Sequence, residues 1–150
     1  MELALQYEVQ ESIGRHAEEA YPDECCGFFF GEDGDIRRIS HVRRATNTRT
    51  ENRGRRFRID PDEYRRAEKF AVDNDLDLLG IYHSHPDHPA EPSEHDRSVA
   101  LPFFSYIIVS VQGGTTSEIR SWRLNGEETF DEETITFLSK QVYATKPISK

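Results

Sequence analysis

The sequence has few cysteines and no long apolar run. Its two cysteines, Cys25 and Cys26, are adjacent in an apolar segment, and neighbours on a strand face opposite ways, which argues against a bridge between them. A reducing cytosol is the simplest setting for such cysteines. No apolar stretch reaches the roughly 18 residues of a transmembrane helix, and residues 1–22 lack the cationic start and apolar stretch of a signal peptide. We therefore expect a cytoplasmic protein that uses no membrane.

Positive charge is also scarce. The 19 lysines and arginines are outnumbered by 28 aspartates and glutamates, which gives a formal net charge of −9. This balance argues against a broadly basic protein that binds nucleic acid. Internal repeats and low-complexity segments are absent, and 150 residues fit one domain with a useful core. We expect a single domain over residues 1–150, in which the tail after about residue 125 is ambiguous between helix and strand.

Arginines nevertheless crowd the stretch between residues 43 and 58. Residues 45–56 have no periodic apolar pattern, which predicts a long loop. We prefer to interpret it as a solvated loop whose arginines pair with the many carboxylates. The alternatives are a flap that recognises the acidic face or C-terminal carboxylate of a partner, or a phosphate-binding cluster that leaves a nucleic-acid role open. The arginines concerned are Arg43, Arg44, Arg49, Arg53, Arg55, Arg56 and Arg58.

Apolar periodicity predicts alternating helices and strands. Leu5, Val9 and Ile13 fall four apart, which indicates an amphipathic helix that ends before Pro22. The alternation predicts an α/β fold with a central mixed β-sheet flanked by helices. We expect further helices over about 60–74 and 93–101, and strands over about 25–31, 36–42, 76–82, 105–112 and 117–124.

The most informative segment runs from His83 to Asp96, HSHPDHPAEPSEHD. In an extended segment, residues two apart point the same way, so His83 and His85 can present both imidazoles to one point. Asp96 can supply a third ligand from the next element and leave one position open, which is typical of a catalytic zinc site. The same letters also fit a helix start, with Ser93 as N-cap and Asp96 three residues later. The two interpretations are compatible, because a capped helix start is a rigid place for a ligand.

A metal-dependent hydrolase also needs a general base. By sequence distance, the candidates are Asp87, Glu91 and Glu94. Glu24 stands before a buried strand, where partial desolvation suits proton transfer near neutral pH. Glu24 is equally well explained as the end of the polar linker after the first helix. The residues alone leave this choice open.

These two segments together resemble the JAMM (MPN-plus) metallopeptidases. The signature of that family is an upstream glutamate, then His-Ser/Thr-His, seven residues, Ser, two residues and Asp. Here Glu24 lies between Pro22 and Gly27, and residues 83–96 match every position of the second part. The resemblance covers the two motifs closely and the order of elements over about residues 1–125. It implies the cytidine-deaminase-like sandwich of the JAMM/MPN fold.

The resemblance also implies roles for individual residues. His83, His85 and Asp96 would hold Zn²⁺, and Glu24 would hold the attacking water and shuttle its proton. Ser93 would donate a hydrogen bond to the developing oxyanion.

Three further residues lie in or near the second motif. Ser84 would point away from the metal, and we interpret it as structural. We interpret His88 and His95 as exposed residues rather than ligands, because the signature has no place for them.

The substrate implied by the resemblance is a ubiquitin-like protein with a C-terminal Gly-Gly. A chain this short is similar to the compact prokaryotic subgroup that acts on small sulfur-carrier proteins. The expected activity is hydrolysis of a peptide or isopeptide bond after that Gly-Gly. The alternatives are a non-catalytic MPN-type scaffold that binds proteins, and a zinc peptidase for unrelated small peptides.

Overall fold

The computed structural model describes residues 1–48 and 57–140, with three helices and seven strands among them. None of the described helices is long and apolar enough to cross a membrane. In chain order the elements are β1 (Glu2–Leu5), α1 (Tyr7–Ala20), β2 (Cys26–Glu32), β3 (Ile36–Ala45), α2 (Pro61–Asp73), β4 (Asp77–Pro86), α3 (Glu94–Val99), β5 (Ser105–Gln112), β6 (Thr115–Leu124) and β7 (Phe130–Phe137).

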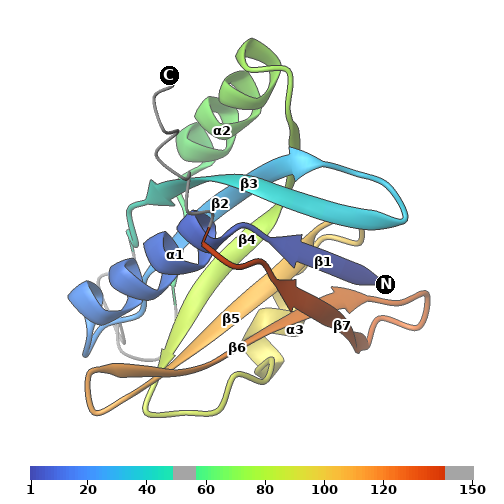
Figure 1. Ribbon diagram of the computed structural model, residues 1–150. Helices are drawn as coiled ribbons and strands as arrows, with labels where there is room; N and C mark the ends of the chain where they lie inside the picture. The colour runs from blue at the N-terminus through green and yellow to red at the C-terminus, as the bar shows by residue number, and fades with distance from the viewer. Residues whose placement is uncertain (49–56, 141–150) are drawn as a thin grey trace, which may run out of the picture.

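The strands form one mixed sheet that closes on itself. Its order is β1-β3-β2-β4-β5-β6-β7, and β1 pairs in parallel with both β3 and β7. β4 and β5 are also parallel, whereas the remaining neighbours are antiparallel. The predicted mixed sheet with helices is confirmed, but the sheet is a closed barrel rather than an open layer. Figure 1 shows β1 and β7 side by side near the N-terminus, where the sheet closes.

The structure corrects the prediction for the first strand and decides the open choice for the tail. Leu5 belongs to β1, and α1 begins only at Tyr7. The prediction that the first helix includes Leu5 is therefore wrong, because Leu5 continues the apolar spacing of the helix by coincidence. The ambiguous tail contains strand β7, in which buried Glu133 is followed two residues later by the partly buried Ile135. That spacing of two is typical of a strand with one inward face.

Two hydrophobic clusters hold the helices to opposite faces of the sheet. Val9, Ile13 and Ala17 of α1 pack in one cluster, and Ala67 and Ala71 of α2 pack in the other. Figure 1 shows the two helices apart from each other on the sheet. β2 contributes to both clusters, because Phe29 faces α1 whereas Phe28 and Phe30 face α2. A strand buried on both faces has no polar alternation, which explains the continuous apolar run at residues 25–31.

The two cysteines follow the same alternation. Cys25 lies in the cluster with α1 and Cys26 in the cluster with α2. Both are free and buried, as predicted. Burial raises the pKa of the Cys25 thiol to about 11, so this residue is protonated at neutral pH.

Strand β4 is longer than predicted and carries the histidines itself. It continues to Pro86, so His83 and His85 lie on the strand and not after it. β4 runs between β2 and β5, with His83 opposite Cys26 on one side and Ile108 on the other. A strand with neighbours on both sides is a rigid mount for side chains.

Candidate metal centre

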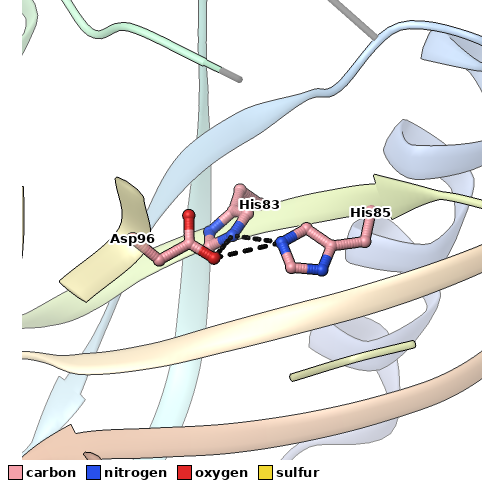
Figure 2. A group of neighbouring side chains, drawn as sticks. All are labelled: His83, His85 and Asp96. Carbon is pink, nitrogen blue, oxygen red and sulfur yellow. Dashed lines mark hydrogen bonds and ion pairs between the residues drawn. The ribbon is translucent and has the colours of Figure 1, made fainter. Parts of the chain in front are cut away.

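Three side chains from two elements converge on one point. The Nε2 atoms of His83 and His85 are 3.1 Å apart, and Oδ2 of Asp96 lies 3.3 Å from the first and 3.1 Å from the second. Figure 2 shows both rings on β4 and the carboxylate of Asp96 pointing at each other. The alternation of β4 puts His83 and His85 on one face, as predicted from their spacing. All three side chains are buried.

The ring of His85 is oriented by a main-chain carbonyl. Its Nδ1 atom lies 2.9 Å from the carbonyl oxygen of Pro89. A carbonyl can only accept, so Nδ1 carries a proton, and Nε2 has a lone pair whenever the ring is neutral. That lone pair points at His83 and Asp96. Histidine ligands in metal sites are commonly fixed in this way. Burial works to lower the pKa of His85, but the hydrogen bond and charge of Asp96 outweigh it and raise this pKa in the absence of a metal ion.

The ring of His83 is held by packing instead. It is 1% exposed and stacks on Phe57 at a centroid distance of 4.6 Å and an interplanar angle of 30°. Its Nδ1 atom has no hydrogen-bond partner among the described residues. Burial lowers the pKa of His83 against the opposing effect of Asp96, which favours the neutral, ligating form of the ring.

The carboxylate of Asp96 is positioned by the start of α3. Ser93 is the N-cap, and its Oγ accepts a hydrogen bond from the Asp96 N–H at 3.0 Å. The Asp96 carboxylate in turn accepts from the Ser93 N–H at 2.8 Å, which completes a capping box. Burial works to raise the pKa of Asp96, but His83, His85 and the Ser93 N–H together hold it far below its usual range. Asp96 is therefore an anion at any physiological pH.

This donor set fits a divalent metal ion such as zinc. Each residue offers one ligand atom, and the three atoms lie within 4.8 Å of one another. Two imidazoles and one carboxylate are a ligand combination that zinc accepts in catalytic sites. The three ligand atoms need a positive charge between them, which a proton on an imidazole supplies without metal and which a bound cation would supply instead. Asp96 is thus both the predicted third ligand and the residue that completes the capping box with the N-cap Ser93.

Glu24 lies close to this centre, in the segment just before β2, the strand next to β4. It is 4% exposed, and its Oε1 atom has no hydrogen-bond partner among the described residues. Burial raises its pKa to about 8, with His85 opposing the shift and Asp96 adding to it. A carboxyl group with such a pKa is suited to take and return a proton near neutral pH.

The main chain next to Glu24 is tied to the ligand strand. The N–H of Cys25 donates to Oγ of Ser84 at 2.9 Å, and the N–H of Ser84 donates to the carbonyl of Cys25 at 3.1 Å. Asn47 donates to the carbonyl of Glu24 at 3.1 Å. Ser84 therefore has a structural role, as predicted, and it links Glu24 to the segment between the two histidines.

A cavity of about 470 Å³ opens beside the three ligands. Glu24, His85 and Ser93 line it, together with Pro89 and Pro92. Ser93 is exposed, and the bond from Asp96 uses only a lone pair of its oxygen. Its hydroxyl hydrogen therefore stays available to a molecule in the cavity.

The other predicted candidates for the general base differ from Glu24 in their exposure, their partners or their position relative to the cavity. Glu91 and Glu94 line the same cavity but are exposed, and they pair with Arg120 and Arg97 respectively. Asp87 does not line the cavity. Its carboxylate accepts hydrogen bonds from the Tyr21 hydroxyl and the Gly113 N–H. Among these carboxylates, Glu24 alone is both buried and at the cavity.

Two histidines have positions that the sequence did not indicate. His88 is exposed, as predicted, whereas His95 is partly buried, and both line the cavity outside the converging cluster. Phe57 and the carbonyl of Pro89 contact the two converging histidine rings, and the sequence predicted neither contact. No local pattern identifies either one, because stacking on a distant ring and main-chain hydrogen bonding leave no mark in the sequence.

The arginine-rich stretch is described only at its ends. Arg44 pairs with Glu19 at 2.9 Å, and the Arg43 guanidinium lies 5.9 Å from the centre of the Phe70 ring. Both residues belong to β3, so their contacts do not bear on the predicted loop. Arg49, Arg53, Arg55 and Arg56 lie outside the described residues.

Known proteins with similar sequences cover most of the chain. A family model described as prokaryotic homologs of the JAB domain matches residues 7–125. A CysO-cysteine peptidase of Mycobacterium tuberculosis is 30% identical over 81% of this chain and 82% of its own length. A desampylase of Haloferax volcanii is 32% identical over 77% of this chain and 85% of its own length.

Solved structures with a similar fold also cover most of the chain. A protein of Desulfitobacterium hafniense is 31% identical, with a TM-score of 0.80 over 95% of this chain and 97% of that one. A JAB1/MPN domain protein of Archaeoglobus fulgidus shares the fold, with a TM-score of 0.56 over 91% of this chain and 97% of that one at 16% identity. The chain therefore belongs to the family of prokaryotic homologs of the JAB domain and is a hydrolytic enzyme of the JAMM type.

Proposed function

We propose that the protein is a zinc peptidase that hydrolyses the peptide or isopeptide bond after the C-terminal Gly-Gly of a small ubiquitin-like sulfur-carrier protein. The observation that carries the proposal is that two sets of residues lie next to each other. His83, His85 and Asp96 converge on one point, and Glu24 and Ser93 line the cavity beside it. The names of the two relatives, a CysO-cysteine peptidase and a desampylase, support a ubiquitin-like substrate.

Each residue has a distinct task in this proposal. His83, His85 and Asp96 would hold the zinc ion, which would supply Lewis-acid chemistry for the substrate carbonyl and the attacking water. The carboxylate of Glu24 takes a proton from the attacking water and returns it to the leaving amine. The hydroxyl of Ser93 donates a hydrogen bond to the developing oxyanion, which is worth about 3 kcal/mol at comparable sites.

A Gly-Gly tail suits the walls of the cavity. Pro89, Pro92 and Ser93 form part of the lining, so rigid rings and a helix start border the approach to the ligands. Only glycine allows an extended main chain to come this close to a reaction centre without a side-chain clash. We propose the Gly-Gly side of the bond as the feature that the substrates of such enzymes share.

The experiment is intact-mass analysis of a sulfur-carrier protein extended by several residues beyond its Gly-Gly. The carrier is incubated with the zinc-loaded protein, with the chelator-treated protein and with Glu24→Gln. We expect the extension to be lost only with the zinc-loaded wild type, and the remaining mass to end at Gly-Gly.

Two modified carriers test which tail and which type of bond the protein prefers. A carrier in which the second glycine is replaced by alanine should be cut much more slowly, because its methyl group meets the cavity wall. A carrier joined through a lysine side chain compares the isopeptide with the peptide. If short unrelated peptides are cut as fast as the carrier, the proposed substrate class is wrong.

A further inference from the structure

The loop that joins the two histidines on β4 to Asp96 on α3 is hydrogen-bonded to the sheet. Residues 87–92 connect the ligand His85 to the N-cap Ser93, and we call them the 87–92 loop. The N–H of Asp87 donates to the carbonyl of Val111 on β5 at 2.7 Å. Ala90, in the middle of the loop, is fully buried. The loop therefore lies against β5 and β6 and does not project into solvent at this point.

Two side chains of the sheet grip carbonyl groups of this loop. Oγ of Ser110 on β5 donates to the carbonyl of His88 at 2.6 Å. Nε1 of Trp122 on β6 donates to the carbonyl of Ala90 at 3.0 Å. His88 and Ala90 are the two neighbours of Pro89. The main chain is thus fixed on both sides of the carbonyl that accepts the hydrogen bond from His85.

The sheet register makes this arrangement compact. Ser110 is the partner of His85 in the β4–β5 pairing, so the two side chains start from neighbouring positions on the same face. Trp122 reaches the loop from the next strand, where its ring also lies under the Arg120 guanidinium at 4.8 Å. Three successive loop carbonyls thus each accept one hydrogen bond: that of His88 from Ser110, that of Pro89 from His85 and that of Ala90 from Trp122.

We propose that Trp122 and Ser110 are positioning residues for the metal ligand His85. By fixing the Pro89 carbonyl, they hold the His85 ring in the rotation that points Nε2 at His83 and Asp96, and so they set the affinity of the centre for zinc. The inference rests on the proposed role of His85 as a ligand. Neither residue touches the metal ligands' converging atoms or lines the cavity, so their effect is indirect.

The test is zinc affinity, measured by competition with a chromophoric chelator, on wild type, Trp122→Phe and Ser110→Ala. Phenylalanine keeps a ring beneath Arg120 and removes only the N–H donor and the second ring of the indole. We expect Trp122→Phe to weaken zinc binding about 10-fold, the lower end of the range for groups that orient metal ligands. The loss in Ser110→Ala should be smaller, because Gln112 also lies within 3.5 Å of the His88 carbonyl.

Ser117→Ala is the matched control for Ser110→Ala. The Ser117 hydroxyl donates to the carbonyl of Ser110 and not to the loop, so its removal should leave zinc affinity unchanged. A second readout is the visible absorption of bound Co²⁺, which reports ligand geometry independently of turnover. We expect the band to change in Trp122→Phe and to stay the same in Ser117→Ala.

The outcomes separate this inference from the proposed function. If wild type binds zinc no better than His85→Ala, the metal role of His85 fails and the proposed function fails with it. If wild type binds zinc tightly and Trp122→Phe and Ser110→Ala bind it equally well with unchanged Co²⁺ spectra, the positioning role alone is wrong. Circular dichroism and thermal unfolding of the metal-free variants identify any variant that does not fold. Should Trp122→Phe be such a variant, the comparison of Ser110→Ala with Ser117→Ala decides.

Discussion

The carboxyl groups of Asp96 and Glu24 at the candidate metal centre are almost equally buried, yet their pKa values are shifted in opposite directions. Asp96 at the start of α3 is 7% exposed, and Glu24 before β2 is 4% exposed. The pKa of Asp96 is held far below its usual range, whereas that of Glu24 is raised to about 8. Burial pushes both values upward, so burial does not explain the difference.

The difference lies in the partners of the two groups. Oδ2 of Asp96 lies within 3.3 Å of both imidazoles and accepts the Ser93 N–H. Oε1 of Glu24 has no such partner among the residues that the structure describes. A helix start supplies N–H donors, whereas the connection before β2 leaves the Glu24 carboxyl group facing the cavity. One carboxylate is thereby suited to ligate a cation and the other to carry a proton.

The largest expected effect concerns Glu24. We expect Glu24→Gln to lower kcat on the extended carrier by roughly 10²- to 10⁴-fold, the range typical of a lost general base. Zinc should still bind, whereas His85→Ala should lose zinc and turnover together. Glu91→Gln is the matched control, because Glu91 lines the same cavity but is exposed and pairs with Arg120. Full activity in Glu24→Gln would show that another group is the base.

The pH dependence of folding sharpens the comparison. Burial raises the pKa of Glu24 from 4.5 to about 8, so the folded state keeps a proton that the unfolded chain releases above pH 4.5. The stabilisation from Glu24 is complete below pH 4.5 and is lost as the pH rises through 8. We expect metal-free Glu24→Gln to gain about 2–4 kcal/mol relative to wild type between pH 5 and pH 8. Urea unfolding at several pH values measures this, and parallel stability curves would contradict the raised pKa.

The next effect concerns Asp96. Asn at this position keeps an oxygen that can accept from the Ser93 N–H but removes the negative charge between the two rings. We expect Asp96→Asn to weaken zinc binding by about 100-fold or more, since changes outside the ligands already cost 10- to 100-fold. Chelator competition measures the affinity. Glu94→Gln in the same helical turn is exposed and should keep the affinity of wild type.

The smallest expected effect concerns Ser84, whose hydrogen bond links the main chain next to Glu24 to the strand that carries the histidines. Ser84→Ala removes the acceptor of the Cys25 N–H and leaves that buried donor without its partner. We expect a loss of about 1–3 kcal/mol in the free energy of unfolding. Ser40→Ala, on the partly exposed strand β3, should change stability by less than about 0.5 kcal/mol. Chemical unfolding compares the two, and equal stabilities would mean that the link carries no weight.

The convergence of His83, His85 and Asp96 could be predicted from the sequence because its geometry is mostly local. His83 and His85 share a face through strand alternation, and the helix cap that places Asp96 follows from the residues around Ser93. The base could not be chosen from the residues alone. Sequence distance favours Glu91 and Glu94, whereas the pairing of β2 with β4 brings Glu24 to the centre.

The closed sheet was beyond the reach of periodicity. Local patterns identified most elements, including β5 with its bounds at residues 105–112. The pairing of β1 with β7 joins segments that no local pattern relates, and Leu5 continues the spacing of α1 well enough to disguise a strand. Likewise, nothing near Trp122 in the sequence indicates that its indole N–H binds the carbonyl of Ala90.

The position of β1 has a consequence for how the molecule is made. Among the described strands, Glu2–Leu5 is synthesised before the others, yet one of its two neighbours is β7, which ends at Phe137. β1 must therefore wait for β7 before its second edge is paired. We expect the β4–β5 region with its histidines to assemble around α1 earlier, while closure of the barrel comes as a late step that waits for distant contacts. Until then the edges of β1 and β7 stay open to pairing with other chains.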